Sequence, residues 1–131
     1  MNKEITVDVI IDDMTHMEGE GVFVQQVAFH GTFWCKVGSG VILPGGVDTQ
    51  TKQGDGPLQL SARYILEGEA EDGSIFHIYI ENNGSFNSPE DHDTTPKVLT
   101  DYGPLKYLES ATLRGRVEGN DHGGVSITIF G

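Results

Sequence analysis

The sequence has a single cysteine, few basic residues and no long hydrophobic run. Cys35 cannot form an internal disulfide by itself, and the opening segment MNKEITVDVIIDD reaches charged residues too soon for the apolar stretch of a signal peptide. No window approaches the roughly 18 consecutive apolar residues that a membrane helix needs. We therefore expect a cytoplasmic protein that does not enter a membrane.

Positive charge is scarce as well. Eight Lys and Arg residues stand against 20 Asp and Glu residues, which gives a net charge of -12 spread from Glu4 to Asp121. Such a chain repels a polyanion, so the charge excludes nucleic acid as a partner. The charge favours a role in solubility, and steering of a cationic ligand is the alternative. The length of 131 residues predicts one domain over residues 1–131.

Signatures of common catalytic machinery are also missing. There is no phosphate loop, no metal-ligand spacing and no paired nucleophile and base. Gly38-Ser39-Gly40 superficially resembles a nucleophile elbow but lacks the strand–turn–helix context. The run Asp91-His92-Asp93 lies in an expected loop without the preformed geometry of a metal site. We therefore expect no metal and no cofactor, and we interpret Cys35 as an inert packed thiol.

What the sequence does contain is alternating hydrophobicity broken by 18 glycines. This period of two is typical of half-buried β-strands, and Asp72-Gly73 marks a hairpin turn. Residues 13–21 and 83–93 are expected to be loops, and the single helical candidate covers residues 104–110. The predicted strands cover residues 4–12, 22–29, 34–43, 47–51, 58–67, 75–82, 95–99, 111–118 and 125–130.

This pattern predicts an all-β protein with at most one short helix. About eight strands at short spacing fit a single closed antiparallel β-barrel or a sandwich. Residues 58–67 place apolar side chains on one face and mixed side chains on the other, which a small barrel with a partly polar lumen accommodates better. We therefore predict a lipocalin-like barrel.

Several motifs strengthen this prediction by resemblance. They are GSGVILPGGVDTQ at residues 38–50, LSARYIL at 60–66, DGSI at 72–75, NNG at 82–84 and TTP at 94–96. In this order, from about residue 31 to residue 130, they resemble an uncharacterised family of small bacterial and fungal β-barrels of the allene oxide cyclase type. The chain departs from that pattern at Thr49, where many relatives carry an aromatic residue, and its segment through Gly21 matches poorly.

The resemblance also implies a ligand site. The recurring polar positions of the family fall on six residues of this chain, which become the candidate ligand-binding residues: Asp48, Gln50, Arg63, Tyr64, Asn82 and Thr95. The catalytic residues, if there are any, are not identified by the resemblance.

The spacing of these residues adds a chemical interpretation. Asp48 and Gln50 share a face of one predicted strand, and Arg63 lies on the next. In a functional interpretation Arg63 orients a ligand carboxylate or enolate oxygen while Asp48 acts as a general base. In a structural interpretation the two charges simply pair, with Gln50 completing the hydrogen bonds. Tyr64 follows Arg63 directly, so only one of the two can face the lumen.

A second polar row lies on the neighbouring predicted strand. His77, Tyr79 and Glu81 share a face, which would form an acid–base cluster if it looked inward and a solvated surface if it did not.

Three hypotheses for function follow. The first is a small-molecule binding barrel whose ligand is apolar with a carboxylate or carbonyl group. The second is a cofactor-free isomerase, cyclase or lyase acting on a small carbonyl metabolite. The third is an interaction module that forms homo-oligomers, most simply dimers, through exposed sheet edges or apolar outer faces.

Overall fold

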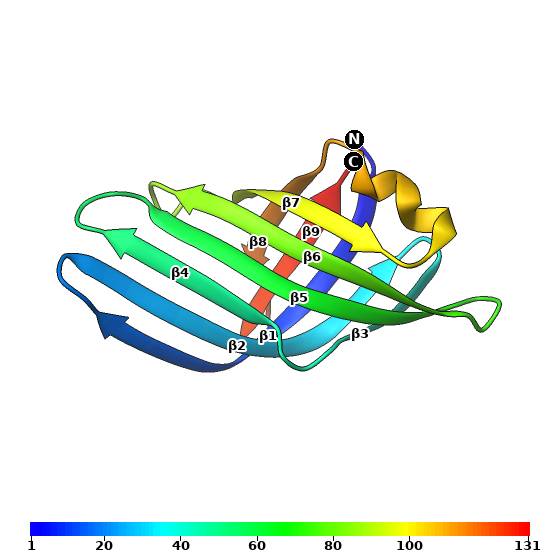
Figure 1. Ribbon diagram of the computed structural model, residues 1–131, viewed down its shortest axis with the longest axis horizontal. Helices are drawn as coiled ribbons and strands as arrows, with labels where there is room; N and C mark the ends of the chain where they lie inside the picture. The colour runs from blue at the N-terminus through cyan, green and yellow to red at the C-terminus, as the bar shows by residue number, and fades with distance from the viewer.

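The computed structural model describes residues 1–131 and contains nine strands and one short 3₁₀ helix, η1. The chain is all-β apart from η1, as predicted, and Figure 1 shows the strands curving around a common interior. The elements are β1 Lys3–Glu18, β2 Val22–Cys35, β3 Gly38–Ile42, β4 Val47–Gln53, β5 Leu58–Ala70, β6 Ile75–Phe86, β7 Asp93–Thr100, η1 Gly103–Glu109, β8 Arg114–Gly119 and β9 Gly124–Phe130.

The sheet closes on itself because the first two strands pair with each other. Every paired neighbour runs antiparallel, and β1 joins β9 on one side and β2 on the other. The short strands β3 and β4 lie one after the other between β2 and β5, so nine strands fill eight positions of the ring. The predicted closed barrel of about eight strands is confirmed.

Several predicted boundaries are wrong. Residues 13–18, expected in a loop, continue β1 after an irregularity between Ile11 and Asp13, because their backbone pairs with β2 although their side chains are mostly polar. Residues 34–43, predicted as one strand, contain the turn between β2, which ends at Cys35, and β3, which begins at Gly38. The sequence did not reveal this turn because no typical turn residue precedes Gly38. Residues 83–86, also expected in a loop, extend β6 by pairing with β5.

One half of the barrel interior is filled with apolar side chains. Side chains from every second position pack there, as the alternation predicted for Ile5, Val7 and Leu66. Phe76 is fully buried in this core, edge to face with Phe33 and stacked on Tyr102. Cys35 is buried in the same core, and burial raises the pKa of its thiol. A buried, protonated thiol is a packing residue.

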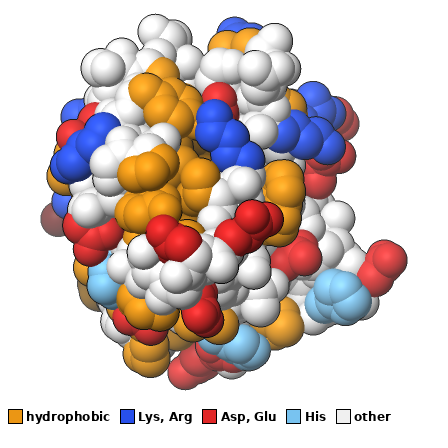
Figure 2. All heavy atoms as spheres, turned by 90° about the vertical axis from the view of Figure 1, so that its right-hand side faces the viewer, with side chains coloured by type: hydrophobic (Ala, Val, Ile, Leu, Met, Phe, Trp, Pro, Cys, Tyr) orange, Lys and Arg blue, Asp and Glu red, His pale blue; other side chains and the backbone are white.

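The helix η1 lies beside β7 near the two chain termini (Figure 1). Its position matches the predicted helix, and Leu105 and Leu108 are buried against the core. Figure 2 views the molecule from the right-hand side of Figure 1 and shows hydrophobic side chains gathered in a band with charged side chains around them. No helix in the chain has the length and apolar character needed to cross a bilayer.

Candidate functional site

The other half of the barrel interior is hollow. A cavity of about 240 Å³ lies inside the strands, and thirteen of its sixteen lining residues are hydrophobic. Its walls include Phe29, Tyr64 and Ile127. They also include Met14, Leu58 and Phe86, which lie near the ends of β1, β5 and β6. We call this cavity the lumen. Its apolar walls are those of a ligand site, and its volume, just below the usual range of about 300–1,000 Å³, suits only a small organic molecule.

Four of the six predicted site residues line the lumen. They are Asp48 and Gln50 on β4, Tyr64 on β5 and Asn82 on β6. The strand register brings Asp48, Ala62 and Asn82 into one row across three adjacent strands. Because Ala62 has only a methyl group, the space between the two polar side chains is left open.

Asp48 is held by a chain of amides. The side-chain amide of Gln25 donates to Oε1 of Gln50 at 3.1 Å, and Nε2 of Gln50 donates to Oδ2 of Asp48 at 2.8 Å. The other carboxylate oxygen, Oδ1, is buried and has no hydrogen-bond partner. Burial raises the pKa of Asp48, while the bond from Gln50 lowers it. One oxygen is thus fixed by Gln50, and the other is covered by protein atoms without a hydrogen-bond partner.

Tyr64 is 2% exposed, and its ring packs edge to face on Phe29 with 5.4 Å between centroids. Gly46 permits this packing, because a Cβ there would lie 2.7 Å from the Cβ of Tyr64. The hydroxyl is buried without a partner. Burial and the nearby charge of Asp48 both raise the pKa of the phenol, so Tyr64 stays protonated and can donate a hydrogen bond.

Asn82 is 1% exposed, and its Oδ1 also has no hydrogen-bond partner. A Cβ at Gly115 would lie 2.1 Å from Oγ1 of Thr94 and 3.2 Å from Oδ1 of Asn82. The absence of a side chain at Gly115 therefore leaves room for both polar atoms. Oγ1 of Thr94 is likewise buried and unpartnered.

Two predicted site residues do not reach the lumen. Thr95 is exposed on the outer face of β7, and its neighbour Thr94 points inward instead. Arg63 faces outward with its side chain 61% exposed, 3.8 Å from a carboxylate oxygen of Glu81. The predicted pairing of Asp48 with Arg63 is therefore wrong. Arg63 is adjacent to Tyr64 on β5, so its side chain points to the outer face when that of Tyr64 points inward.

The row of His77, Tyr79 and Glu81 also lies on the outer face, opposite the buried residues of β6. The two ring nitrogens of His77 lie 2.8 Å from Asp101 and 3.0 Å from Glu67. These hydrogen bonds raise the pKa of His77, Asp101 contributing most. The solvated-surface interpretation of this row is the one that the structure supports.

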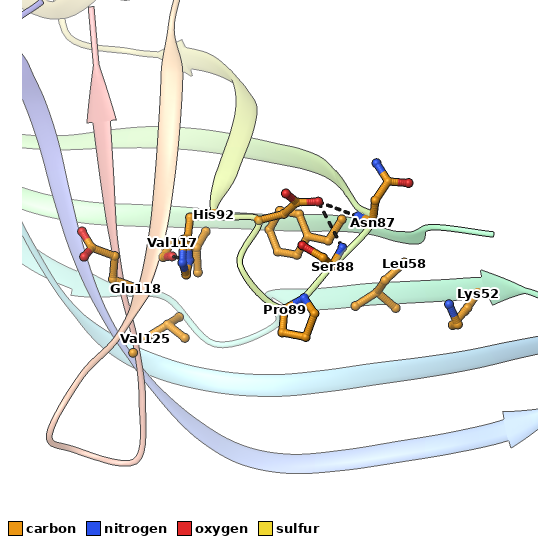
Figure 3. A pocket seen from close by; sticks show the side chains of 12 residues that line it. Lys52, Leu58, Asn87, Ser88, Pro89, His92, Val117, Glu118 and Val125 are labelled. Atoms are coloured by element: carbon orange, nitrogen blue, oxygen red, sulfur yellow. Dashed lines mark hydrogen bonds between the residues drawn. The ribbon is translucent and has the colours of Figure 1, made fainter. Parts of the chain in front are cut away.

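Figure 3 shows a second cavity, of about 440 Å³. It shares lining residues with the lumen. We call it the vestibule. The segment 87–92 forms one wall, where the carboxylate of Asp91 accepts bonds from the backbone nitrogens of Asn87 and Ser88. The backbone nitrogen of Val117 donates to the carbonyl of His92, which attaches this segment to β8. The four residues common to both cavities are Leu58, Phe86, Val117 and Val125.

The sequence interpretation did not identify Met14 and Phe86 as lining residues of the lumen, or Thr94 as a residue that faces the interior. The signal for Thr94 was present, because it has the same parity as Val98 on β7. Met14 and Phe86 lie on strand extensions that the sequence interpretation treated as loops. To identify these two residues from the sequence, one would need to know that β1 and β6 are longer than their hydrophobic alternation indicates.

Fold and site together define a small antiparallel barrel with a mainly apolar cavity that a few polar side chains also line. The chain belongs to the family described as "Protein of unknown function (DUF3237)", whose model matches residues 3–103. This confirms the resemblance to an uncharacterised family.

A curated relative, a UPF0311 protein from Clostridium acetobutylicum, is 44% identical over 54 residues, which are 41% of this chain and 32% of the relative. The match thus spans about a third of that relative's length.

Two solved structures illustrate the fold. A protein of unknown function from Clostridium acetobutylicum has a TM-score of 0.82 and 22% identity, with 98% of this chain and 95% of that chain covered. An enzyme from Penicillium herquei has a TM-score of 0.69 and 13% identity, with 98% and 92% covered. At these identities the likeness establishes the fold alone.

Proposed function

We propose that the barrel binds a small, mainly apolar organic molecule in the lumen, with a hydroxyl or carbonyl group among Asp48, Tyr64 and Asn82. The observation that carries this proposal is that each of these residues has a buried polar atom without a hydrogen-bond partner. All three residues line the same, otherwise apolar, cavity.

Energetics support a ligand at this point. A buried polar atom without a partner costs about 1–3 kcal/mol, and such atoms are rare in folded proteins. Three residues that carry such atoms line one cavity, and this favours a site whose polar groups pair with a ligand. The outer face offers no comparable arrangement, because the polar side chains of Arg63, His77 and Glu81 there have protein partners.

The position of the vestibule suggests how the ligand lies. The polar group would be placed deep in the lumen, and an apolar body would extend past Leu58 and Phe86 toward the vestibule. Gln50 would act indirectly by fixing the orientation of the Asp48 carboxylate. The fungal neighbour is an enzyme, so a barrel of this shape is compatible with a bound substrate.

A thermal-shift screen against small aromatic and aliphatic ketones and alcohols tests the proposal. A compound that binds only the folded protein raises the melting temperature by mass action. We expect wild type to be stabilised by a member of this class and Tyr64→Phe to bind it about tenfold more weakly, which matches the loss of one hydrogen bond of about 1.4 kcal/mol.

Arg63→Ala is the matched control, since it alters the adjacent position on β5 but faces outward. Equal binding by wild type and Arg63→Ala is expected. A hit that Arg63→Ala abolishes and Tyr64→Phe retains would place the site on the outer face and contradict the proposal. The homodimeric state and the cytoplasmic location stay predictions.

A further inference from the structure

We propose that the lumen catalyses proton transfer on an α-hydroxyketone, with Asp48 removing the proton from the carbon that carries the hydroxyl, Tyr64 donating to the carbonyl oxygen and Asn82 accepting from the hydroxyl. This inference rests on the proposed ligand site and adds the substrate class and the reaction. It is a cofactor-free interconversion of two hydroxyketones through an enediol.

The first argument is the placement of the three groups. Asp48, Tyr64 and Asn82 come from three consecutive strands, and the row containing Asp48 and Asn82 has only Ala62 between them. Two strand spacings separate their backbones by roughly 9–10 Å. Tyr64 lies on the middle strand, two residues from Ala62 and on the same face. The head group of the proposed substrate, two adjacent carbons that each carry an oxygen, would lie among these three side chains.

The second argument is the chemical complementarity of the free atoms. Oδ1 of Asn82 is an acceptor and requires a donor, such as a hydroxyl. The Tyr64 hydroxyl is protonated and requires an acceptor, such as a carbonyl oxygen. A simple ketone leaves Asn82 without a donor, and a simple alcohol leaves no carbonyl to acidify the neighbouring C–H bond. An α-hydroxyketone carries both groups on adjacent carbons.

The third argument concerns Asp48 as the base. Its Oδ2 is fixed by Gln50 while Oδ1 remains free. No cation lines the lumen, and the only other titratable residue in the lining is Tyr64. Lys52, on the same strand, donates to the backbone carbonyl of Gly56. Burial without a cationic partner makes a carboxylate more basic than it is in water.

The proposed step balances without any co-reactant. The carboxylate of Asp48 takes the proton from the hydroxyl-bearing carbon, and the C–H electron pair forms a carbon–carbon double bond. The former carbonyl oxygen receives the electron pair of its π bond and accepts a hydrogen bond from Tyr64, which gives the anion of an enediol. The hydroxyl proton of the second oxygen then passes to this oxygen, and Asp48 returns its proton to the former carbonyl carbon. The carbonyl has moved by one carbon, and both side chains are restored.

Proton exchange in deuterated water tests this step. The probe is α-hydroxypropiophenone, whose isomer is phenylacetylcarbinol, and proton NMR follows both the loss of the C–H signal and the appearance of the isomer. We expect exchange with wild type to saturate with probe concentration. Asp48→Asn is expected to lose at least about 100-fold of the rate, the typical contribution of a positioned general base. Tyr64→Phe is expected to lose about 100-fold, as for the loss of an oxyanion donor.

Asp8→Asn is the matched control, because Asp8 lies on the outer face of β1 and accepts a bond from Ser126. It is expected to leave the exchange rate unchanged. Saturation-transfer NMR in the same samples reports whether each variant holds the probe, and circular dichroism reports whether it is folded. Binding by wild type without C–H exchange would overturn the catalytic inference and leave the binding proposal standing.

Exchange that persists at the wild-type rate in Asp48→Asn would also overturn the inference, because the base would then lie elsewhere. Absence of any binding to wild type would overturn the substrate class and, with it, the reaction. Exchange lost equally in Asp8→Asn would show an effect of surface carboxylates and would contradict the assignment to the lumen.

Discussion

Replacing Phe76 with alanine is expected to lower the free energy of unfolding by about 3–5 kcal/mol, the usual loss for a fully buried phenylalanine. Phe76 is 0% exposed. Its ring contacts Phe33 at a centroid distance of 6.1 Å and Tyr102 at 5.1 Å, which connects β2, β6 and the segment before η1. The substitution removes these contacts and leaves a cavity in the filled half of the barrel.

Urea denaturation followed by circular dichroism measures the loss, and an unchanged slope indicates that the extent of unfolding is the same. Ile75→Ala is the control, because Ile75 is the neighbouring residue and is 58% exposed. It should change stability by less than about 0.5 kcal/mol. Similar losses in the two variants would mean that the Phe76 side chain does not support the core as the structure indicates.

The second large effect is expected at Ala62, the small residue between Asp48 and Asn82. In Ala62→Leu the added carbon atoms enter the lumen at the point where the ligand's polar group would lie. We expect ligand affinity to fall at least about 100-fold, or about 2.7 kcal/mol, because the side chain and the ligand compete for the same space. Isothermal calorimetry with a compound found in the thermal-shift screen measures this loss.

Stability should change little in the same variant. The new side chain fills an existing cavity, so the strain of about 1–3 kcal/mol that overpacking usually causes is mostly avoided. Gln59→Leu is the matched control, since Gln59 is exposed on the outer face of β5. Undiminished affinity in Ala62→Leu, with the variant shown to be folded, would contradict a ligand site in the lumen.

The fold could be predicted from the sequence where side-chain alternation was regular. The residues from Leu58 to Leu66 alternate without interruption, and the inner face of β5 is the one that the pattern indicated. The hairpin at Asp72-Gly73 and the position of η1 also agree with the prediction. These features depend on local preferences, which a single sequence displays directly.

Strand ends could not be predicted because they depend on partners distant in the sequence. The continuation of β1 through Met17 is set by its pairing with Val24 and its neighbours on β2, although the segment is acidic and exposed. In the same way, β6 continues to Phe86 because β5 begins opposite it at Leu58. Such pairings override the weak strand preference of the residues involved.

The candidate site was predicted only in part. Asp48, Gln50, Tyr64 and Asn82 lie on strands whose inner face follows from parity. Arg63 was included with them because the resemblance placed a recurring polar position there, although Arg63 and Tyr64 are adjacent and so face opposite sides of β5. The absence of a cation from the lining of the lumen is a property of the folded structure, and it removes the interpretation of Asp48 as half of an ion pair.

The most direct test of the lumen site is a nitrogen–proton NMR titration of the labelled protein with α-hydroxypropiophenone. If the ligand binds as proposed, the largest shift changes will fall on the side-chain amides of Asn82 and Gln50 and on the backbone amides of Asp48 and Tyr64. Shift changes confined to the outer face, for example at Thr95, or no saturable change at all, would contradict a ligand site inside the barrel.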